Sequence, residues 1–485
     1  MKKFWMTTLL IGMTTLLGRA AGRERPNILL ILADDLGYGN VDCYNPGPSI
    51  PTPHLDRLSR EGRRFMQAYA PAAVCTPTRY GILTGQYPWR GPLKDGVVME
   101  YEHPIVAPEL ITLPERLKTA GYATACIGKW HLGMTWPTVD GEPLRTDFSK
   151  RPSYDAFVEL AKRIDYKGEV RSGPVDHGFD YYYGEGVINF PPYMFIENDR
   201  FAEKPAGLRL KGLSGAPGMM SADYTDESVL ARQSDAVLEY LDRRAKGGRE
   251  TPFFLYWAPN AIHYPICPSA DFRGKTEHGP YGDFMYELDA AVGRVVDRID
   301  ELDLRENTLI VFTSDNGPRR PRLPTGHDCT AGLRGRKASD YDGGVKVPFI
   351  ASWPGTIPTN TASDAVISLV DLYPTFTKLG GAECTNQFTD GIDVREALVE
   401  GTLANSDERA IVMTSVRGKF ALRRGKWSLL SHPGNGIKRY DGDEDTPTQL
   451  YDLHEDRGQR NNLFPEFPEK ARELERDLKR VRALE

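Results

Sequence analysis

Pro26-Asn27-Ile28-Leu29-Leu30-Ile31-Leu32-Ala33 is a nearly continuous apolar run with charged residues on both sides. A run of this length and composition is typical of a strand buried on both faces, as in a parallel sheet. Asp34 and Asp35 follow the run directly. Because ligands of open α/β sheets gather beyond the carboxyl ends of the strands, these two carboxylates are candidate site residues.

Three similar apolar runs recur along the chain, and small or polar residues follow each of them. The runs span 123–127, 252–257 and 308–313, and the last one leads into Ser314-Asp315-Asn316-Gly317. Amphipathic helical patterns lie between the runs, at 228–244 and 286–302. Strands that alternate with helices predict an α/β fold, with a mostly parallel sheet flanked by helices.

The first residues are typical of an export signal. Lys2 and Lys3 precede an apolar stretch at 4–17, and small residues follow up to Gly22. The stretch is short for a membrane span, and no later stretch is long and apolar enough to cross a bilayer. We therefore predict a signal peptide at 1–22, export to the periplasm or the medium, and no stable membrane span. An uncleaved N-terminal anchor is the alternative.

The remaining chain is predicted to form two domains. Residues 23–390 carry the α/β pattern, and their irregular segment at 134–228 is interpreted as loop insertions near the site. Residues 391–485 are predicted to form a smaller α+β subdomain of antiparallel strands and a helix. Its signals are a hairpin around Arg424-Gly425, a short strand at 450–453 and a terminal helix at 468–484.

Charge and cysteine spacing argue against several classes of protein. The 61 Lys and Arg residues nearly balance the 67 Asp and Glu residues, so the charge indicates no nucleic-acid partner. The six cysteines lie far apart without a Cys-x-x-Cys pair, which argues against a zinc ribbon. The sequence therefore does not predict a disulfide framework, and the state of the cysteines stays open.

Asp34, Asp35, Asp315 and Asn316 provide four oxygen ligands at the ends of two predicted strands. Oxygen-only ligand sets favour hard cations, calcium or magnesium, over zinc. Asp and Asn also commonly cap helices and turns, so either pair alone is open to that interpretation. Both pairs together with the run that begins at Cys75 predict a metal site.

The most distinctive run is Cys75-Thr76-Pro77-Thr78-Arg79-Tyr80-Gly81-Ile82-Leu83-Thr84-Gly85. With it, the chain resembles the type I, formylglycine-dependent sulfatases, an arylsulfatase-like family of the alkaline phosphatase superfamily. The resemblance is carried in order by residues 27–37, 75–85, 121–133, 313–317, 333–337 and 343–348. It implies an alkaline-phosphatase-like α/β fold and an enzyme that hydrolyses sulfuric esters, with 23–390 as the catalytic domain.

The resemblance implies that Cys75 is only the precursor of the catalytic group. A formylglycine-generating or radical maturing enzyme would convert it to formylglycine, whose hydrate would attack sulfur and form a covalent sulfoenzyme intermediate. The implied cofactor is one Ca²⁺, with Mg²⁺ as the less favoured ion, bound by Asp34, Asp35, Cys75 after conversion, Asp315 and Asn316. Thr78 departs from the family pattern, in which Ser or Ala stands between the proline and the arginine.

The resemblance also implies roles for five further side chains. Arg79 would stabilise the hydrate and hold the metal-binding carboxylates, and His131 would be the base that triggers release of sulfate. The substrate-binding residues would be Lys129, His263 and Lys337, which would contact the sulfate oxygens. Either His263 or Lys337 would protonate the leaving alcohol.

Several other polar or aromatic residues have a weaker context. His177 is interpreted as structural, and His327 and Arg334 are not expected to reach the substrate. The run Tyr181-Tyr182-Tyr183 is more typical of packing than of a sugar platform.

Three hypotheses for the function follow. The leading one is an exported sulfatase that removes sulfate from a sulfated carbohydrate, as in polysaccharide degradation. The first alternative is a phosphoester or phosphonate hydrolase of the same superfamily, although the ligands of a second metal cannot be assembled from this sequence. The second alternative is a non-catalytic protein that binds sulfated glycans with Cys75 unconverted. The sugar, the sulfated hydroxyl, exo or endo action and the oligomeric state stay open.

Overall fold

The structure is a computed structural model that describes residues 25–484, apart from 46, 48, 145–151, 211–214, 249, 385–386 and 439–447. The predicted signal peptide at 1–22 lies outside the described residues, so its prediction stays untested. Within the described residues, no helix combines the length and apolar character that crossing a membrane requires.

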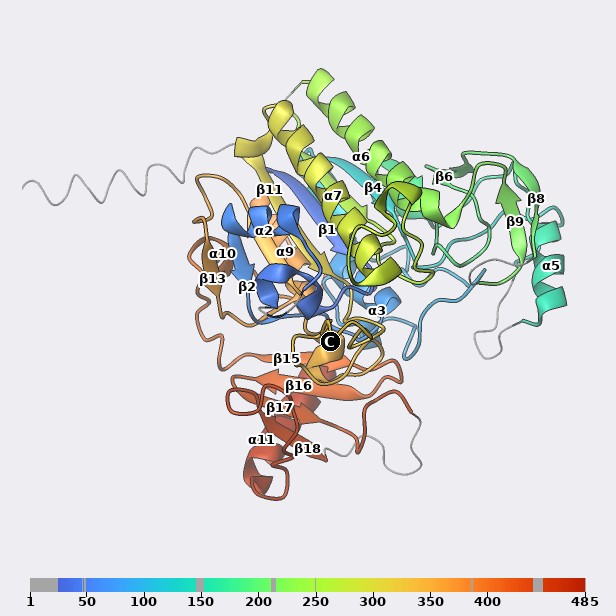
Figure 1. The fold of residues 1–485 in the computed structure, drawn as a ribbon. Coiled ribbons are helices and arrows are strands. Elements are labelled where there is room, and N and C mark those ends of the chain that lie inside the picture. Colours follow the sequence, from blue (N-terminus) through green and yellow to red (C-terminus); the bar gives the residue numbers. More distant parts are fainter. Residues whose placement is uncertain are drawn as a thin grey trace, which may run out of the picture.

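Ten strands form the main sheet, and β1 (Asn27–Ala33) lies near its middle (Figure 1). β1 pairs in parallel with β11 (Thr308–Ser314) on one side and with β10 (Phe253–Ala258) on the other. β4 (Ala123–Gly128) pairs in parallel with β10. All seven residues of β1 are buried. The four predicted strands and the mostly parallel sheet are therefore confirmed.

Shorter strands extend both edges of this sheet. Beyond β11 the order is β12 (Phe349–Ser352), β2 (Arg63–Phe65) and β13 (Thr361–Ser363). Beyond β4 it is β5 (Tyr181–Gly184), β6 (Ile196–Glu197) and β7 (Arg200–Phe201). A separate two-stranded pairing joins β3 (Ala68–Tyr69) to β14 (Ile367–Ser368).

Helices cover both faces of the sheet because alternate residues of the central strand point to opposite sides. Leu29 and Ile31 pack with α2 (Pro53–Arg60), α6 (Val229–Lys246) and α7 (Gly279–Glu301). Ile28 and Leu30 pack instead with α3 (Cys75–Thr84), α4 (Leu113–Thr119) and α9 (Leu372–Leu379). Figure 1 shows α6 and α7 side by side across one face.

The chain between 134 and 228 is more regular than expected, so its interpretation as loops alone is wrong. It holds α5 (Tyr154–Arg163), a hairpin of β8 (Pro205–Arg209) and β9 (Gly218–Ser221), and the edge strands β5 to β7. The tyrosine run is β5, which pairs in parallel with β4 and buries Tyr182 completely. These elements escaped notice because they are short and lack a long apolar run.

The helix predicted at 286–302 is α7, which begins seven residues earlier, at Gly279. Gly279 and Pro280 resemble a helix break, but a proline is tolerated in the first helical turn, where its missing N–H costs no hydrogen bond. The helix predicted at 228–244 is α6, which ends two residues later than expected.

The C-terminal part is a four-stranded antiparallel sheet with one helix, as predicted. It consists of β15 (Ala410–Thr414), β16 (Phe420–Arg424), β17 (Trp427–Leu430), β18 (Gln449–Asp452) and α11 (Pro468–Ala483). Leu474 and Leu478 of α11 pack on Leu422 and Leu429 of the sheet. The short helices α8 (Asp342–Val345) and α10 (Arg395–Val399) precede it. The exact domain boundary at 390/391 stays a prediction.

Candidate active site

The parallel pairing of β1 and β11 brings the two acidic pairs together. Ala33 is the register partner of Ser314, so Asp34 and Asp315 leave neighbouring strands at the same level. The Asp35 N–H donates to Asp315 Oδ1 at 3.2 Å, and Asn316 Nδ2 donates to Asp35 Oδ1 at 2.9 Å. All four predicted metal ligands of these strand ends therefore form one buried cluster.

Cys75 is the first residue of α3, and its side chain lies against this cluster. Its Sγ and one carboxylate oxygen each of Asp34 and Asp315 all lie within 4.8 Å of one another. Burial raises the pKa of the Cys75 thiol, and Lys129 and Lys337 only partly oppose this effect. An unconverted Cys75 is therefore a protonated, weakly nucleophilic thiol in this setting.

Three cationic side chains hold the three carboxylates. Arg79 donates to Asp315 Oδ2 through Nη2 at 2.7 Å, Lys129 Nζ lies 2.6 Å from Asp34 Oδ2, and Lys337 Nζ lies 2.5 Å from Asp35 Oδ1. Arg79 also donates to the Lys129 carbonyl oxygen at 3.1 Å. Each of the three cations thus fixes one carboxylate through one of its oxygens.

The opposite oxygen atoms of the cluster remain without hydrogen bonds. Asp34 Oδ1, Asp35 Oδ2 and Asn316 Oδ1 are buried and have no hydrogen-bond partner among the described residues. Arg79 Nη2, at 3.9 Å, lies too far from Asp34 Oδ1 for a hydrogen bond. Unsatisfied buried acceptors are costly, and a hard cation bound by these oxygens removes that cost. The donor set therefore fits Ca²⁺.

The charges of the cluster shift the pKa values of its members in different directions. Burial opposes ionisation of Asp35, but Lys337, followed by His263 and Lys129, outweighs it and holds the pKa of Asp35 well below its usual value. Burial and the nearby Asp34 carboxylate raise the pKa of Asp315. Burial also opposes the charge of Lys337, but Asp35 outweighs it and raises the Lys337 pKa.

His131 presents an unprotonated ring nitrogen near the N-terminus of α3. Its Nε2 lies 2.9 Å from the Val98 carbonyl oxygen, which can only accept, so Nε2 carries the proton. Nδ1 is buried without a hydrogen-bond partner in the described chain. Burial, Lys129 and Arg79 lower the pKa of His131 well below its usual value. Thr76 donates to the His131 carbonyl oxygen at 3.0 Å and ties it to α3.

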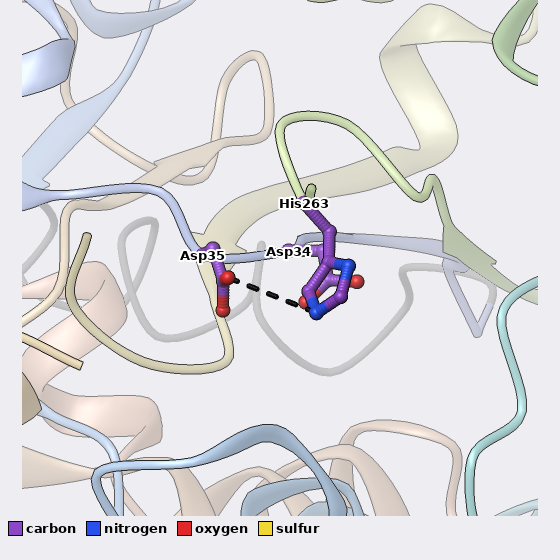
Figure 2. Close-up of side chains that lie close together, drawn as sticks. All are labelled: Asp34, Asp35 and His263. Carbon is purple, nitrogen blue, oxygen red and sulfur yellow. Dashed lines mark ion pairs between the residues drawn. The ribbon is translucent and has the colours of Figure 1, made fainter. Parts of the chain in front are cut away.

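His263 approaches the cluster from the loop after β10. Figure 2 shows its ring facing Asp34 and Asp35, with Nε2 3.8 Å from Asp35 Oδ2. Its Nδ1 lies 2.7 Å from the Tyr264 carbonyl oxygen and therefore carries the proton. Burial and Lys337 lower the pKa of His263 well below its usual value. The site-facing Nε2 is thus a lone-pair donor in the neutral ring.

The structure brings all the sequence-predicted site residues to one place: Asp34, Asp35, Cys75, Arg79, Lys129, His131, His263, Asp315, Asn316 and Lys337. The two groups of side chains that could hold a metal share Asp34, so they describe one site within the described chain. The individual catalytic roles stay predictions.

The residues with weaker context lie outside the cluster. His177 stacks on Trp130 at a centroid distance of 6.0 Å, which fits its structural interpretation. Arg334 Nη1 donates to the Gln459 carbonyl oxygen at 2.7 Å. His327 is buried beside Asn40 and His278.

Sequence reasoning missed a buried polar group behind Lys129. Glu185 follows β5, and its Oε1 accepts hydrogen bonds from Gln233 Nε2 at 3.0 Å and from Asn260 Nδ2. Burial raises the pKa of Glu185 to about 8. The sequence signal that could have indicated this polar group was Asn260, three residues before His263. The group links the loop of His263 to the end of β5.

The segment that leads into Cys75 is held by the C-terminal sheet. Ala73 N–H donates to the Thr414 carbonyl oxygen at 2.8 Å, and Thr414 N–H donates to Pro71 O at 3.0 Å. The Ala73 carbonyl oxygen accepts from Ala338 N–H at 2.7 Å, next to Lys337. Thr78 is also buried, and its hydroxyl donates to Ala72 O at 3.1 Å. The C-terminal sheet therefore helps to position both Cys75 and Lys337.

We expect Arg79→Ala to cost about 3–5 kcal/mol of unfolding free energy in the presence of a chelator. The variant leaves Asp315 buried without its cation, because both side chains are fully buried. The matched control is Arg57→Ala, which breaks an ion pair with Asp297 of the same 2.7 Å length between partly exposed side chains. That control should cost about 0–1 kcal/mol. Urea denaturation measures both, and equal losses would contradict the buried ion pair as the cause.

Comparisons with known proteins show which family the chain resembles. A family model described as Sulfatase matches residues 26–382. The chain is 30% identical to an N-acetylgalactosamine-6-O-sulfatase of Bacteroides thetaiotaomicron, over 95% of this chain and 93% of that protein. It is 33% identical to human arylsulfatase A, over 97% of this chain and 90% of the relative.

A solved structure from Bacteroides thetaiotaomicron, described under the metabolism of multiple glycosaminoglycans, has the same fold. Its TM-score is 0.81 at 28% sequence identity, and the match covers 95% of this chain and all of the other.

Proposed function

The chain belongs to the sulfatase family, and on that premise we propose that it removes sulfate from a sulfated carbohydrate, using Ca²⁺ and a formylglycine formed from Cys75. The observation that carries this proposal is the set of three unsatisfied buried oxygens, on Asp34, Asp35 and Asn316, in the cluster that includes Cys75. Sulfuric ester hydrolysis follows from the family; the carbohydrate and the two catalytic groups are the proposal.

The charge of the cluster favours an anionic substrate once a cation is bound. Three carboxylates face three cations, Arg79, Lys129 and Lys337, so their charges cancel. A divalent cation leaves the site with a positive charge of two units, which complements a sulfate group. When bound, Ca²⁺ would polarise the sulfate and stabilise the charge that develops on its oxygens.

The side chains around position 75 suit a nucleophile that first binds the sulfate group covalently and then releases it. Formylglycine at this position would supply a hydrate with two hydroxyls, one to attack sulfur and one to lose a proton. His131 holds its proton on Nε2 and keeps Nδ1 available, so it is our candidate for accepting that second proton. Lys129 is held by Asp34 within the cluster, where its ammonium group can stabilise a sulfate oxygen.

The leaving alcohol must receive a proton from His263 or Lys337. His263 Nε2 faces Asp35 and can carry a proton only after the ring becomes doubly protonated. Lys337 carries protons throughout, but Asp35 raises its pKa and makes it a weaker acid. Both remain candidates. Lys337 can donate to sulfate oxygens from its position, whereas His263 Nε2 can do so only in the doubly protonated ring.

Relatives support a carbohydrate as the substrate class. One is named N-acetylgalactosamine-6-O-sulfatase, and the structural neighbour is described under glycosaminoglycan metabolism. The predicted signal peptide at 1–22 supports export, which would bring the enzyme to sulfated polymers outside the cytoplasm. We also propose 23–390 as the catalytic domain and 391–485 as the subdomain that positions it.

The proposal is tested by measuring sulfate release from a panel of substrates, with protein made together with a maturing enzyme. The panel contains 6-O-sulfated N-acetylgalactosamine, its 4-O-sulfated isomer, other sulfated oligosaccharides and an aryl sulfate. We expect kcat/KM to be highest for a sugar sulfate, because the relatives act on such groups. An enzyme that releases sulfate only from the aryl ester would contradict the carbohydrate assignment.

The two alternatives make different predictions about the same protein. A phosphoester hydrolase of the two-metal type would bind two tightly held ions per chain, whereas the single cluster predicts one. A glycan-binding protein would keep an unmodified Cys75 thiol in every preparation from the native host. Metal analysis and intact-mass measurement of the Cys75 peptide distinguish these cases.

A further inference from the structure

A large cavity opens beside the metal-ligand cluster, on the side of Asp35. Its volume is about 700 Å³, within the roughly 300–1,000 Å³ of typical small-molecule sites. Part of its lining is apolar or aromatic, from Ile262, Tyr264, Ile266, Tyr281 and Leu323. A cavity of this size beside the sulfate-binding groups can hold the sugar that carries the ester and part of a neighbouring one.

Two adjacent arginines, Arg319 and Arg320, also line the cavity. Both are exposed, and neither forms an ion pair with a carboxylate in the described part of the chain. Arg319 lies over the Tyr264 ring, with its guanidinium carbon 4.8 Å from the ring centroid. Arg322, three residues beyond Arg319, is also exposed but pairs with Asp328 at 2.9 Å. The first two arginines are therefore available to a ligand.

The arginine pair is mounted on segments that also carry the site. Arg319 and Arg320 lie three and four residues after Asn316, and Lys337 N–H donates to the Pro318 carbonyl oxygen at 2.9 Å. Tyr264, which supports Arg319, follows His263 directly and accepts its Nδ1 hydrogen bond. The positions of the two guanidinium groups are thus coupled to those of the metal ligand, the histidine and the lysine.

We propose that Arg319 and Arg320 bind a second anionic group of the glycan, a carboxylate or another sulfate, so that the preferred substrate is polyanionic. This inference rests on the proposed function and specifies its substrate. Arginine matches both groups because its planar N–H fork pairs with carboxylate and sulfate oxygens. Glu277 lines the same cavity, and its negative charge repels an anionic ligand. One carboxylate cannot neutralise both arginines, so the cavity still favours an anion.

The test compares disaccharides that share one sulfated sugar and differ in the second residue. That residue is a uronic acid, a sulfated hexose or a neutral hexose. For the wild-type protein we expect kcat/KM to favour the two anionic disaccharides, mainly through KM, and the preference to shrink with added salt. In the double variant Arg319→Gln/Arg320→Gln, the ratio of anionic to neutral kcat/KM should fall about tenfold.

Arg322→Gln is the matched control, because it removes an exposed arginine of the same loop that already has a partner. It should keep the wild-type ratio, and Glu277→Gln should raise it. The inference is overturned if the wild-type protein shows no preference, if the double variant keeps it, or if Arg322→Gln loses it equally. Comparing kcat/KM for the uronic acid disaccharide with that for the disulfated disaccharide shows whether the arginines prefer a carboxylate or a second sulfate.

Calorimetric binding of the same disaccharides separates this inference from the proposed function. One outcome is that no sulfate is released, but the anionic disaccharides bind more tightly than the neutral one and the double variant abolishes that difference. This result would support the anion site and contradict the proposed hydrolysis. If sulfate is released at equal rates from all three, the hydrolysis stands and the anion site fails.

Discussion

Cys75→Ala is expected to lower the turnover of sulfate esters by about 10⁴-fold or more, because it removes the precursor of the nucleophile. Cys75→Ser should also fail to turn over. A serine hydroxyl can attack sulfur and displace the alcohol, but it has no second hydroxyl to expel the sulfate. At most one alcohol per chain is therefore released, and the sulfate stays bound to the serine. Sulfate release under multiple-turnover conditions measures both variants.

Cys126→Ala is the control for the loss of a buried thiol. Cys126 is fully buried in β4, outside the metal-ligand cluster, and its removal should leave most of the activity. Mass analysis of the Cys75 peptide in the wild-type protein should reveal the loss of sulfur and two hydrogens and the gain of one oxygen. Full activity in Cys75→Ala would rule out position 75 as the nucleophile, whatever the state of the peptide.

Removal of calcium is the second change with a large expected effect. A chelator should abolish sulfate release, and added Ca²⁺ should restore it, because three buried oxygens of the cluster otherwise lack partners. Ca²⁺ should also raise the unfolding temperature, since a ligand at 100 times its dissociation constant stabilises the fold by about 2.7 kcal/mol. Thermal unfolding with and without Ca²⁺ gives a readout that does not depend on activity.

Asp35→Asn should weaken this calcium-dependent shift, because it replaces a charged ligand that is held by Lys337 and Asn316. Asp289→Asn is the matched control. Asp289 is also buried, but it accepts hydrogen bonds from the backbone N–H groups of His54 and Leu55 and is not part of the metal-ligand cluster. The control should lower stability and keep the calcium shift. A calcium shift that persists unchanged in Asp35→Asn would contradict the assigned metal site.

Local patterns in the sequence were sufficient for the elements that frame the site. The apolar run of β1 and that of β11 predicted two buried parallel strands, and the acidic residues after them were expected to meet at one edge. The hairpin at Arg424-Gly425 was predicted from turn residues between two short strands. These signals are local, because periodicity and turn chemistry act over a few residues.

Weaker local signals left other elements hidden. β5 to β9 are short, and none of them is buried along its whole length, so no apolar run marks them. The early start of α7 was masked by Gly279 and Pro280, which are typical of a helix break but are tolerated in the first helical turn. Tertiary packing decided these cases.

The candidate chemical groups can all be read from the amino-acid sequence: the cysteine of the run at 75–85, four oxygen-bearing side chains after two strands, and the lysines, histidines and arginine that accompany them. The folded chain is needed to decide which oxygen of a carboxylate is held by a cation and which lacks a hydrogen bond. It also decided which nitrogen of His131 and His263 is free, and that Arg319 and Arg320 line the cavity beside Asp35. The reason is physical, because these contacts join residues far apart in the chain and depend on sheet register and packing, which no local pattern specifies.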